Sequence, residues 1–120
     1  MFTEVFTLMA TNFEEFVHKM AEEAPHSVVL DWYRRLDLTV RDYGNTTRVH
    51  REPRERAELM IARDPLLGGG VANELAALRT LRNEVAHTAL AVSSETAITY
   101  AHQCFAMIGL IMKAQDTHTA

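Results

Sequence analysis

Four side chains that could act on a charged ligand lie close together in one stretch of the sequence: Arg79, Arg82, Asn83 and His87. The stretch has helical periodicity, and at about 100° per residue Arg82 falls about 20° from the line of its apolar residues. A charge within an apolar stripe is costly unless it is paired or functional. Because a guanidinium makes forked contacts with carboxylates and phosphates, this position singles out Arg82 as a candidate binding residue.

A second line of the same predicted helix carries small and polar residues. At about 100° per residue it spans roughly 80° to 160° from the apolar line, and it contains Ala72, Ala76, Arg79, Asn83 and His87. Small residues let another backbone approach closely, so the line predicts a contact face with a cleft. Arg82 and His87 diverge by about 140° on an ideal helix. They would meet at one ligand if the Arg side chain curled over Ala86, or if a twofold partner supplied the second set.

Residues 82–87 have the pattern Arg-Asn-x-x-x-His, which resembles the signature of the HEPN superfamily. In that family an Arg is usually followed by a polar residue such as Asn, with a His a few positions later. The context is also similar, since family members are helical chains of about this length with the motif late on the penultimate long helix. The resemblance in helical architecture extends over most of the chain, whereas the resemblance in sequence motif is limited to six residues.

The resemblance implies a metal-independent endoribonuclease that works as a homodimer and uses no cofactor. It assigns His87 the role of general base or acid, for which a pKa near neutrality is suited. It assigns Arg82 to stabilise charge on the phosphate, Asn83 to orient the His or the RNA backbone, and Arg79 to bind RNA. Attack by the ribose 2′-hydroxyl would leave 2′,3′-cyclic phosphate ends.

Many members of this family are toxins or defence effectors encoded with an antitoxin, so an antitoxin or regulatory protein is an expected partner. In one subgroup a partner nucleotidyltransferase modifies a Tyr two residues after the His, but this chain has Ala89 there. Other members have lost catalysis. The alternative function is therefore a catalytically inactive HEPN-like helical module that acts as a dimeric binding or regulatory protein.

Two further interpretations compete for the same residues. Arg82 could be a structural residue paired with a carboxylate of another helix, and the candidates are Asp31, Asp37 and Asp42. His87 could simply suit the dipole near a helix C-terminus.

Two Glu-x-x-His pairs, Glu15 to His18 and Glu84 to His87, have the spacing of a di-iron carboxylate centre. Since Glu15 and His18 lie about 140° or more from the apolar line through Phe13, we expect them to face solvent, and no metal site is predicted.

Helical periodicity extends over almost the whole chain, and prolines and glycines divide it into five segments. The first helix runs to about Glu23, and the second is expected to be capped by His26 or Ser27 and to end at Gly44. A third runs from Pro53 to before Pro65, and Gly68 to Gly70 is expected to be a flexible joint. The fourth helix spans Val71 to about Leu90, and the fifth Ser94 to about Gln115, with a cap at Ser93 or Ser94. The fifth is expected to be central because it is apolar on several sides.

These segments predict an all-α, antiparallel four- to five-helix bundle in one domain of residues 1–120. The expected dimer contact is the face of the fourth helix, either alone or together with the fifth. The 120 residues carry a net charge of -4, which argues against a non-specific nucleic-acid coat. The single cysteine, Cys104, excludes an intramolecular disulfide. Residues 1–10 lack the basic region of a signal peptide, and no apolar run reaches membrane-spanning length. A cytoplasmic protein is therefore expected.

Overall fold

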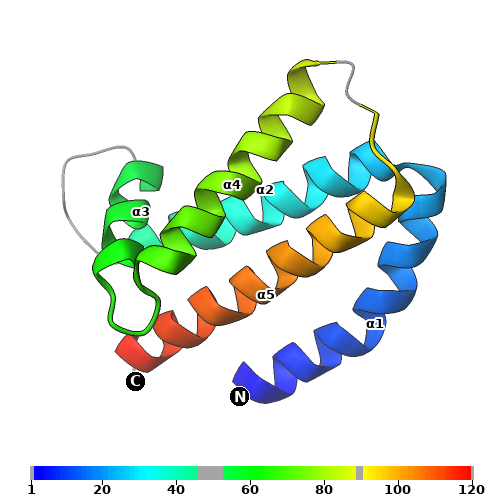
Figure 1. The fold of residues 1–120 in the computed structure, drawn as a ribbon. Helices are drawn as coiled ribbons and strands as arrows, with labels where there is room; N and C mark the ends of the chain where they lie inside the picture. Colours follow the sequence, from blue (N-terminus) through cyan, green and yellow to red (C-terminus); the bar gives the residue numbers. More distant parts are fainter. Residues whose placement is uncertain (1, 46–52, 89–90, 120) are drawn as a thin grey trace.

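The computed structural model describes residues 2–45, 53–88 and 91–119, and the side chains of 12–45, 57–88 and 91–118. Within these ranges the chain forms five α-helices and no strand (Figure 1). The helices are α1 (Phe2–Glu23), α2 (Pro25–Gly44), α3 (Pro53–Arg63), α4 (Gly68–His87) and α5 (Ser94–Thr119). The all-α fold predicted from the periodicity is confirmed. In the described ranges no helix is long and apolar enough to cross a membrane.

Helix α2 lies at the centre of the bundle and packs against each of the other four helices, most extensively against α5. These two helices run in the same direction, because Trp32 lies beside Phe105 and Asp42 beside Gln115 (Figure 1). Helices α1 and α4 run the opposite way. The prediction of an antiparallel bundle is therefore wrong for the central pair. Helical periodicity carries no direction, and α4 makes the return pass that lets α5 start at the same end of the bundle as α2.

The connection between α1 and α2 is a single residue, Ala24, with φ -150° and ψ 72°. Pro25 occupies the first turn of α2, where its missing N–H interrupts no helical hydrogen bond. Ala24 makes no side-chain capping hydrogen bond. The expectation that His26 or Ser27 caps this helix is therefore wrong, and the rigid proline ring starts it instead.

Helix α4 begins and ends about three residues earlier than the periodicity predicted. Gly68 to Gly70 form its first residues rather than a flexible joint, and Gly68 enters the helix with φ +83°, a conformation that favours glycine. The helix ends at His87, because Thr88 is extended with φ -129° and ψ 170°. The predicted end near Leu90 lies outside the described residues.

Helix α5 is as central as its apolar composition predicted. The hydroxyl Oγ of Ser93 accepts a hydrogen bond from the backbone N–H of Thr96 at 3.0 Å, which confirms the predicted cap. The helix continues past the expected end at Gln115 to Thr119. Its buried side chains face α2, α1 and α4 and are Ala97, Tyr100, Ala101, Cys104, Met107, Ile108, Ile111 and Ala114.

An aromatic cluster joins α1, α2 and α5 in the core. Phe13 meets Trp32 edge-on at 4.9 Å between ring centroids, and Phe105 lies 4.3 Å from Phe13. Such aromatic pairs stabilise the fold beyond the contribution from burying their apolar surface. By contrast Phe16, another large apolar residue of α1, is 53% exposed. The apolar stripe of α1 is therefore narrower than its periodicity indicates.

Candidate functional site

The predicted site lies on the last two turns of α4, the part of this helix that diverges from α5 (Figure 1). Its apolar side is held by Leu78, whose carbonyl accepts a 2.8 Å hydrogen bond from the hydroxyl of Tyr100, and by the buried Val85. Asn83, Ala86 and His87 are exposed. The small and polar line is thus exposed at its C-terminal end, whereas Ala72, Ala76 and Arg79 are partly buried.

Arg82 is half-buried and points back toward α2. Its guanidinium carbon lies 5.8 Å from the ring centroid of Tyr33, and its Nη1 donates a 3.2 Å hydrogen bond to Oδ1 of Asn83. In the described part of the chain no carboxylate forms an ion pair with Arg82. A half-buried cation with only neutral partners retains most of its capacity to bind an anion.

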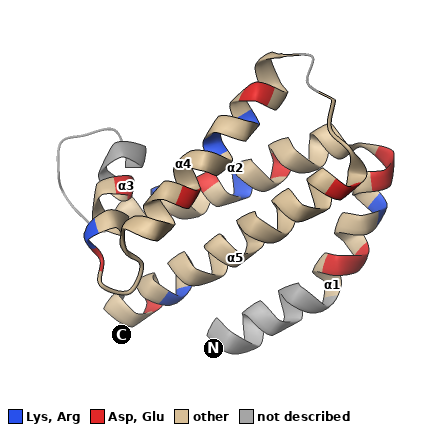
Figure 2. Ribbon diagram, in the orientation of Figure 1, with Lys and Arg blue, Asp and Glu red and all other residues tan. Residues whose placement is uncertain are grey.

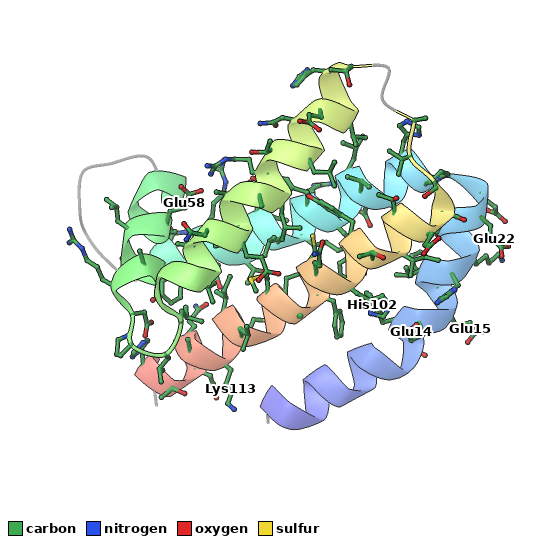
Figure 3. The ribbon with its side chains drawn as sticks, viewed as in Figure 1. Glu14, Glu15, Glu22, Glu58, His102 and Lys113 are labelled. Carbon is green, nitrogen blue, oxygen red and sulfur yellow. The ribbon has the colours of Figure 1, made fainter. Side chains whose placement is uncertain are left out.

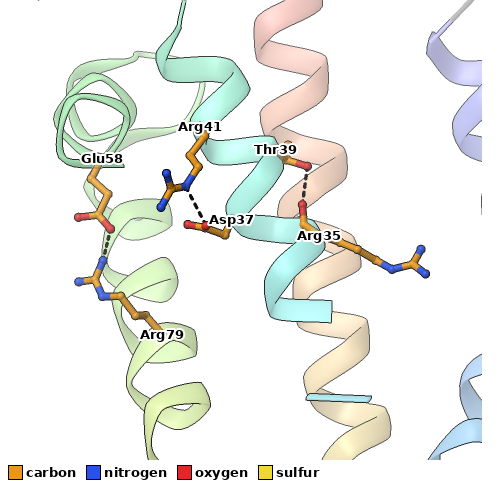
Figure 4. A network of polar contacts seen from close by, with 6 residues as sticks. All are labelled: Arg35, Asp37, Thr39, Arg41, Glu58 and Arg79. Carbon is orange, nitrogen blue, oxygen red and sulfur yellow. Dashed lines mark hydrogen bonds and ion pairs between the residues drawn. The ribbon is translucent and has the colours of Figure 1, made fainter. Parts of the chain in front are cut away.

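The structural pairing of Arg82 with an aspartate, considered from the sequence, is wrong. Each candidate carboxylate has another neighbour: Asp31 pairs with Arg35, Asp37 with Arg41, and Asp42 accepts from Gln115. The first two are pairs four residues apart on α2, which a helix brings together through its own geometry; Figure 4 shows the Asp37–Arg41 pair. Figure 2 shows the basic and acidic residues of α2 interspersed along the helix.

Arg79 forms an ion pair with Glu58 of α3 (Figure 4). The pair joins two helices that are separated by a short turn, and about a third of each side chain is exposed. The sequence predicted an RNA-binding role for Arg79 but gave no indication of this partner. The ion pair gives Arg79 a structural role that Arg82 does not share.

His87 is the last residue of α4 and is exposed. Arg82 contacts Tyr33 and Asn83 rather than His87. The side chain of Arg82 therefore does not curl over Ala86 toward His87 in one chain. The structure brings Arg82 and Asn83 together. His87 lies one helical turn beyond Asn83 on the same face of α4, and the described contacts of Arg82 do not include it.

A second polar group was missed by the sequence analysis. Glu15 and His18 are exposed, as expected, but His18 lies beside Glu14 and not beside Glu15. Glu14, His18 and His102 present ligand atoms that all lie within 4.8 Å of one another. The spacing of Glu14 and His18 at four residues was available as a signal, whereas the approach of His102 depends on how α1 packs on α5.

A third polar group surrounds Asp64, which is 6% exposed at the turn between α3 and α4. It accepts hydrogen bonds from the hydroxyl of Tyr43 and from the backbone N–H of Leu66, and Nε2 of His118 lies 2.7 Å from its Oδ2. Burial acts to raise the pKa of Asp64, but these hydrogen bonds outweigh it and the pKa is lowered. The group ties the end of α5 to α2 and to this turn.

Comparison with known proteins found no matching family, no similar curated protein and no similar solved structure.

Proposed function

We propose that this chain is a metal-independent endoribonuclease of the HEPN type that cleaves RNA at a cleft shared by two copies of the chain. The observation that carries the proposal is the state of Arg82, a half-buried cation without a carboxylate partner among the described residues. It belongs to an Arg-Asn-x-x-x-His pattern whose Asn and His are exposed at the end of α4.

Arg82 is suited to the phosphate because little has to be broken to release it. A hydrogen bond to the neutral oxygen of Asn83 contributes about 1 kcal/mol, and a cation–π contact such as that with Tyr33 about 0.5–1 kcal/mol. A forked bond to a phosphate replaces both with a charge-assisted interaction. Arg79 binds the RNA backbone through the guanidinium N–H groups that Glu58 does not occupy.

In the proposed reaction His87 takes the proton of the ribose 2′-hydroxyl, and the 2′-oxygen attacks the adjacent phosphorus. The bond from phosphorus to the 5′-oxygen breaks, and the departing oxygen receives the same proton back from the His87 imidazolium. Arg82 neutralises charge on the non-bridging oxygens as the phosphorus becomes pentacoordinate, and Asn83 positions Arg82. The products are a 2′,3′-cyclic phosphate and a 5′-hydroxyl.

A second copy is part of the proposal because Arg82 and His87 of one chain point to different surroundings. A twofold axis near the exposed line of α4 would bring Arg82 of one copy toward His87 of the other. As a ribonuclease the protein would act as a toxin or defence effector, with an antitoxin as its protein partner.

The experiment is RNA cleavage in EDTA by the wild type and by His87→Ala and Arg82→Ala. His26→Ala and Arg34→Ala are matched controls, because they remove exposed residues of the same types from α2. We expect both site variants to lose at least 100-fold in rate and both controls to keep activity. An oligonucleotide with 2′-deoxyribose at the cleaved position should resist cleavage.

Mixing Arg82→Ala with His87→Ala tests the shared cleft. Random pairing makes about half of the dimers mixed, and each mixed dimer holds one intact site of two, so about a quarter of the activity should return. No recovery would place the site within one chain. A folded wild type that dimerises but cleaves no RNA would favour the inactive binding module instead.

A further inference from the structure

We propose that Glu14, His18 and His102 form a binding site for a divalent transition-metal ion of the zinc class, across the seam between α1 and α5. Oε2 of Glu14 lies 3.2 Å from Nε2 of His18, and Oε1 of the same carboxylate lies 3.0 Å from Nε2 of His102. Figure 3 shows Glu14 of α1 and His102 of α5 side by side at this seam. Three metal-ligating side chains from two helices thus converge on one point.

The backbone and the core position these side chains. Glu14 and His18 are four residues apart and therefore lie on the same face of α1. His102 comes from α5, and its ring packs edge-on against Phe13 with 5.1 Å between ring centroids. Phe13 is itself anchored in the aromatic cluster with Trp32. The His102 imidazole is consequently directed toward Glu14 by core packing, so the site exists only when α1 is docked on α5.

The ligand set selects the class of ion. Two imidazole nitrogens and one carboxylate oxygen are ligands of zinc and similar ions, whereas magnesium and calcium prefer oxygen alone. Ligands about 2.0–2.1 Å from a tetrahedral zinc ion lie about 3.3 Å from each other. The separations of 3.2 and 3.0 Å from the Glu14 carboxylate to the two imidazole nitrogens are close to this value, and all three ligand atoms lie within 4.8 Å of one another. About half of each side chain is exposed, which leaves room for water as a fourth ligand.

The site is separate from the proposed ribonuclease centre, because none of its ligands comes from α4. A bound ion would link α1 to the central helix α5 and stabilise the folded chain. An ion that binds only the folded chain stabilises it by an amount that grows with the ratio of free ion concentration to Kd. At one hundred times the Kd, and with the unfolding entropy typical of a 120-residue chain, this stabilisation raises the Tm by about 10 °C.

The test is titration of the full, tag-free and EDTA-washed chain with Zn²⁺, followed by calorimetry and by thermal unfolding. We expect one ion per chain and a rise in Tm that Mg²⁺ does not produce. Glu14→Gln, His18→Gln and His102→Gln should each weaken Zn²⁺ binding at least 10-fold. Glu15→Gln is the matched control, since it removes the same charge from the adjacent exposed position of α1, and it should bind like the wild type.

The result that would overturn the proposal is Zn²⁺ binding that is absent from the wild type, or that is equal in the wild type and Glu14→Gln. The far-UV circular dichroism and ion-free Tm of each variant show whether it is folded. If one variant fails to fold, the two remaining ligand substitutions decide the outcome. Cleavage assays in EDTA separate this site from the ribonuclease, because removal of the ion should leave cleavage intact.

Discussion

Replacement of Asp64 by Ala should destabilise the fold strongly, because one buried carboxylate holds three segments together. Asp64 accepts hydrogen bonds from Tyr43 of α2 and from the backbone of Leu66, and His118 of α5 lies against it. Tyr43 is 3% exposed, so its hydroxyl would lose its Asp64 acceptor in a dry environment. His118 is half exposed and returns to water at little cost.

The size of the effect follows from the two bonds that water cannot replace fully. A hydrogen bond to a charged acceptor contributes about 1.5–3 kcal/mol, so the loss of the Tyr43 and Leu66 bonds predicts about 3–6 kcal/mol of unfolding free energy. For 120 residues this corresponds to a fall in Tm of about 12–24 °C. Tyr43→Phe, which removes one of these bonds, should cost about 1.5–3 kcal/mol.

The same carboxylate predicts a pH dependence with a definite sign. Burial would raise the pKa of Asp64, but the hydrogen bonds it accepts lower it below its ordinary value. The folded state therefore holds this proton less tightly than the unfolded state. The stabilisation is fully present above the unfolded pKa of about 4 and is lost as the pH falls through the folded pKa. Asp64→Ala should lose less stability than the wild type between pH 5 and pH 2.

Urea unfolding followed by circular dichroism at pH 7 and at pH 3 measures both effects. Asp42→Ala is the control, since it removes an exposed aspartate that also contacts α5, and it should change the free energy of unfolding by less than 1 kcal/mol. A loss below about 1 kcal/mol for Asp64→Ala at pH 7 would refute the reasoning. So would a pH dependence equal to that of the wild type.

Three further perturbations test other parts of the fold. Tyr100→Phe removes the buried hydrogen bond to the carbonyl of Leu78 and should cost about 1–2 kcal/mol in urea unfolding; an unchanged midpoint would contradict this role. Burial raises the pKa of the Cys104 thiol to about 12. Cys104 of the folded protein should therefore react with a thiol reagent at least about 1,000-fold more slowly than in urea. Rapid labelling of the folded protein would contradict the burial of Cys104. Gly68→Ala should lower the unfolding free energy by about 1–2 kcal/mol because of its φ of +83°, whereas Gly69→Ala within the same helix should be neutral or stabilising in thermal unfolding.

The sequence predicted the elements well where apolar periodicity was strong. The extent of α1, the span of α3 and the central position of α5 follow from the spacing of apolar residues and from prolines. The prolines and glycines that mark helix ends were more ambiguous signals than the apolar spacing. Pro25 can follow one helix or begin the next, and the glycines at 68–70 can be a joint or a first turn. Only the packing of the neighbouring helices decides between these readings.

Contacts between distant segments could not be predicted in the same way. The parallel arrangement of α2 and α5 depends on the path of α3 and α4, and the pairing of Arg79 with Glu58 depends on how α3 meets α4. Arg82 was recognised as unusual because a charge occupied an apolar line, although its contact with Tyr33 was not foreseen. The approach of His102 to Glu14 left no trace in the spacing of either residue.

The most direct test of the proposed ribonuclease is the rate of RNA cleavage in EDTA by the wild type and by His87→Ala, with the product ends identified. The account predicts cleavage by the wild type that leaves 2′,3′-cyclic phosphates, and a loss of at least 100-fold in His87→Ala with an unchanged Tm. Equal rates for the two proteins, or no cleavage by a folded and dimeric wild type, would contradict it.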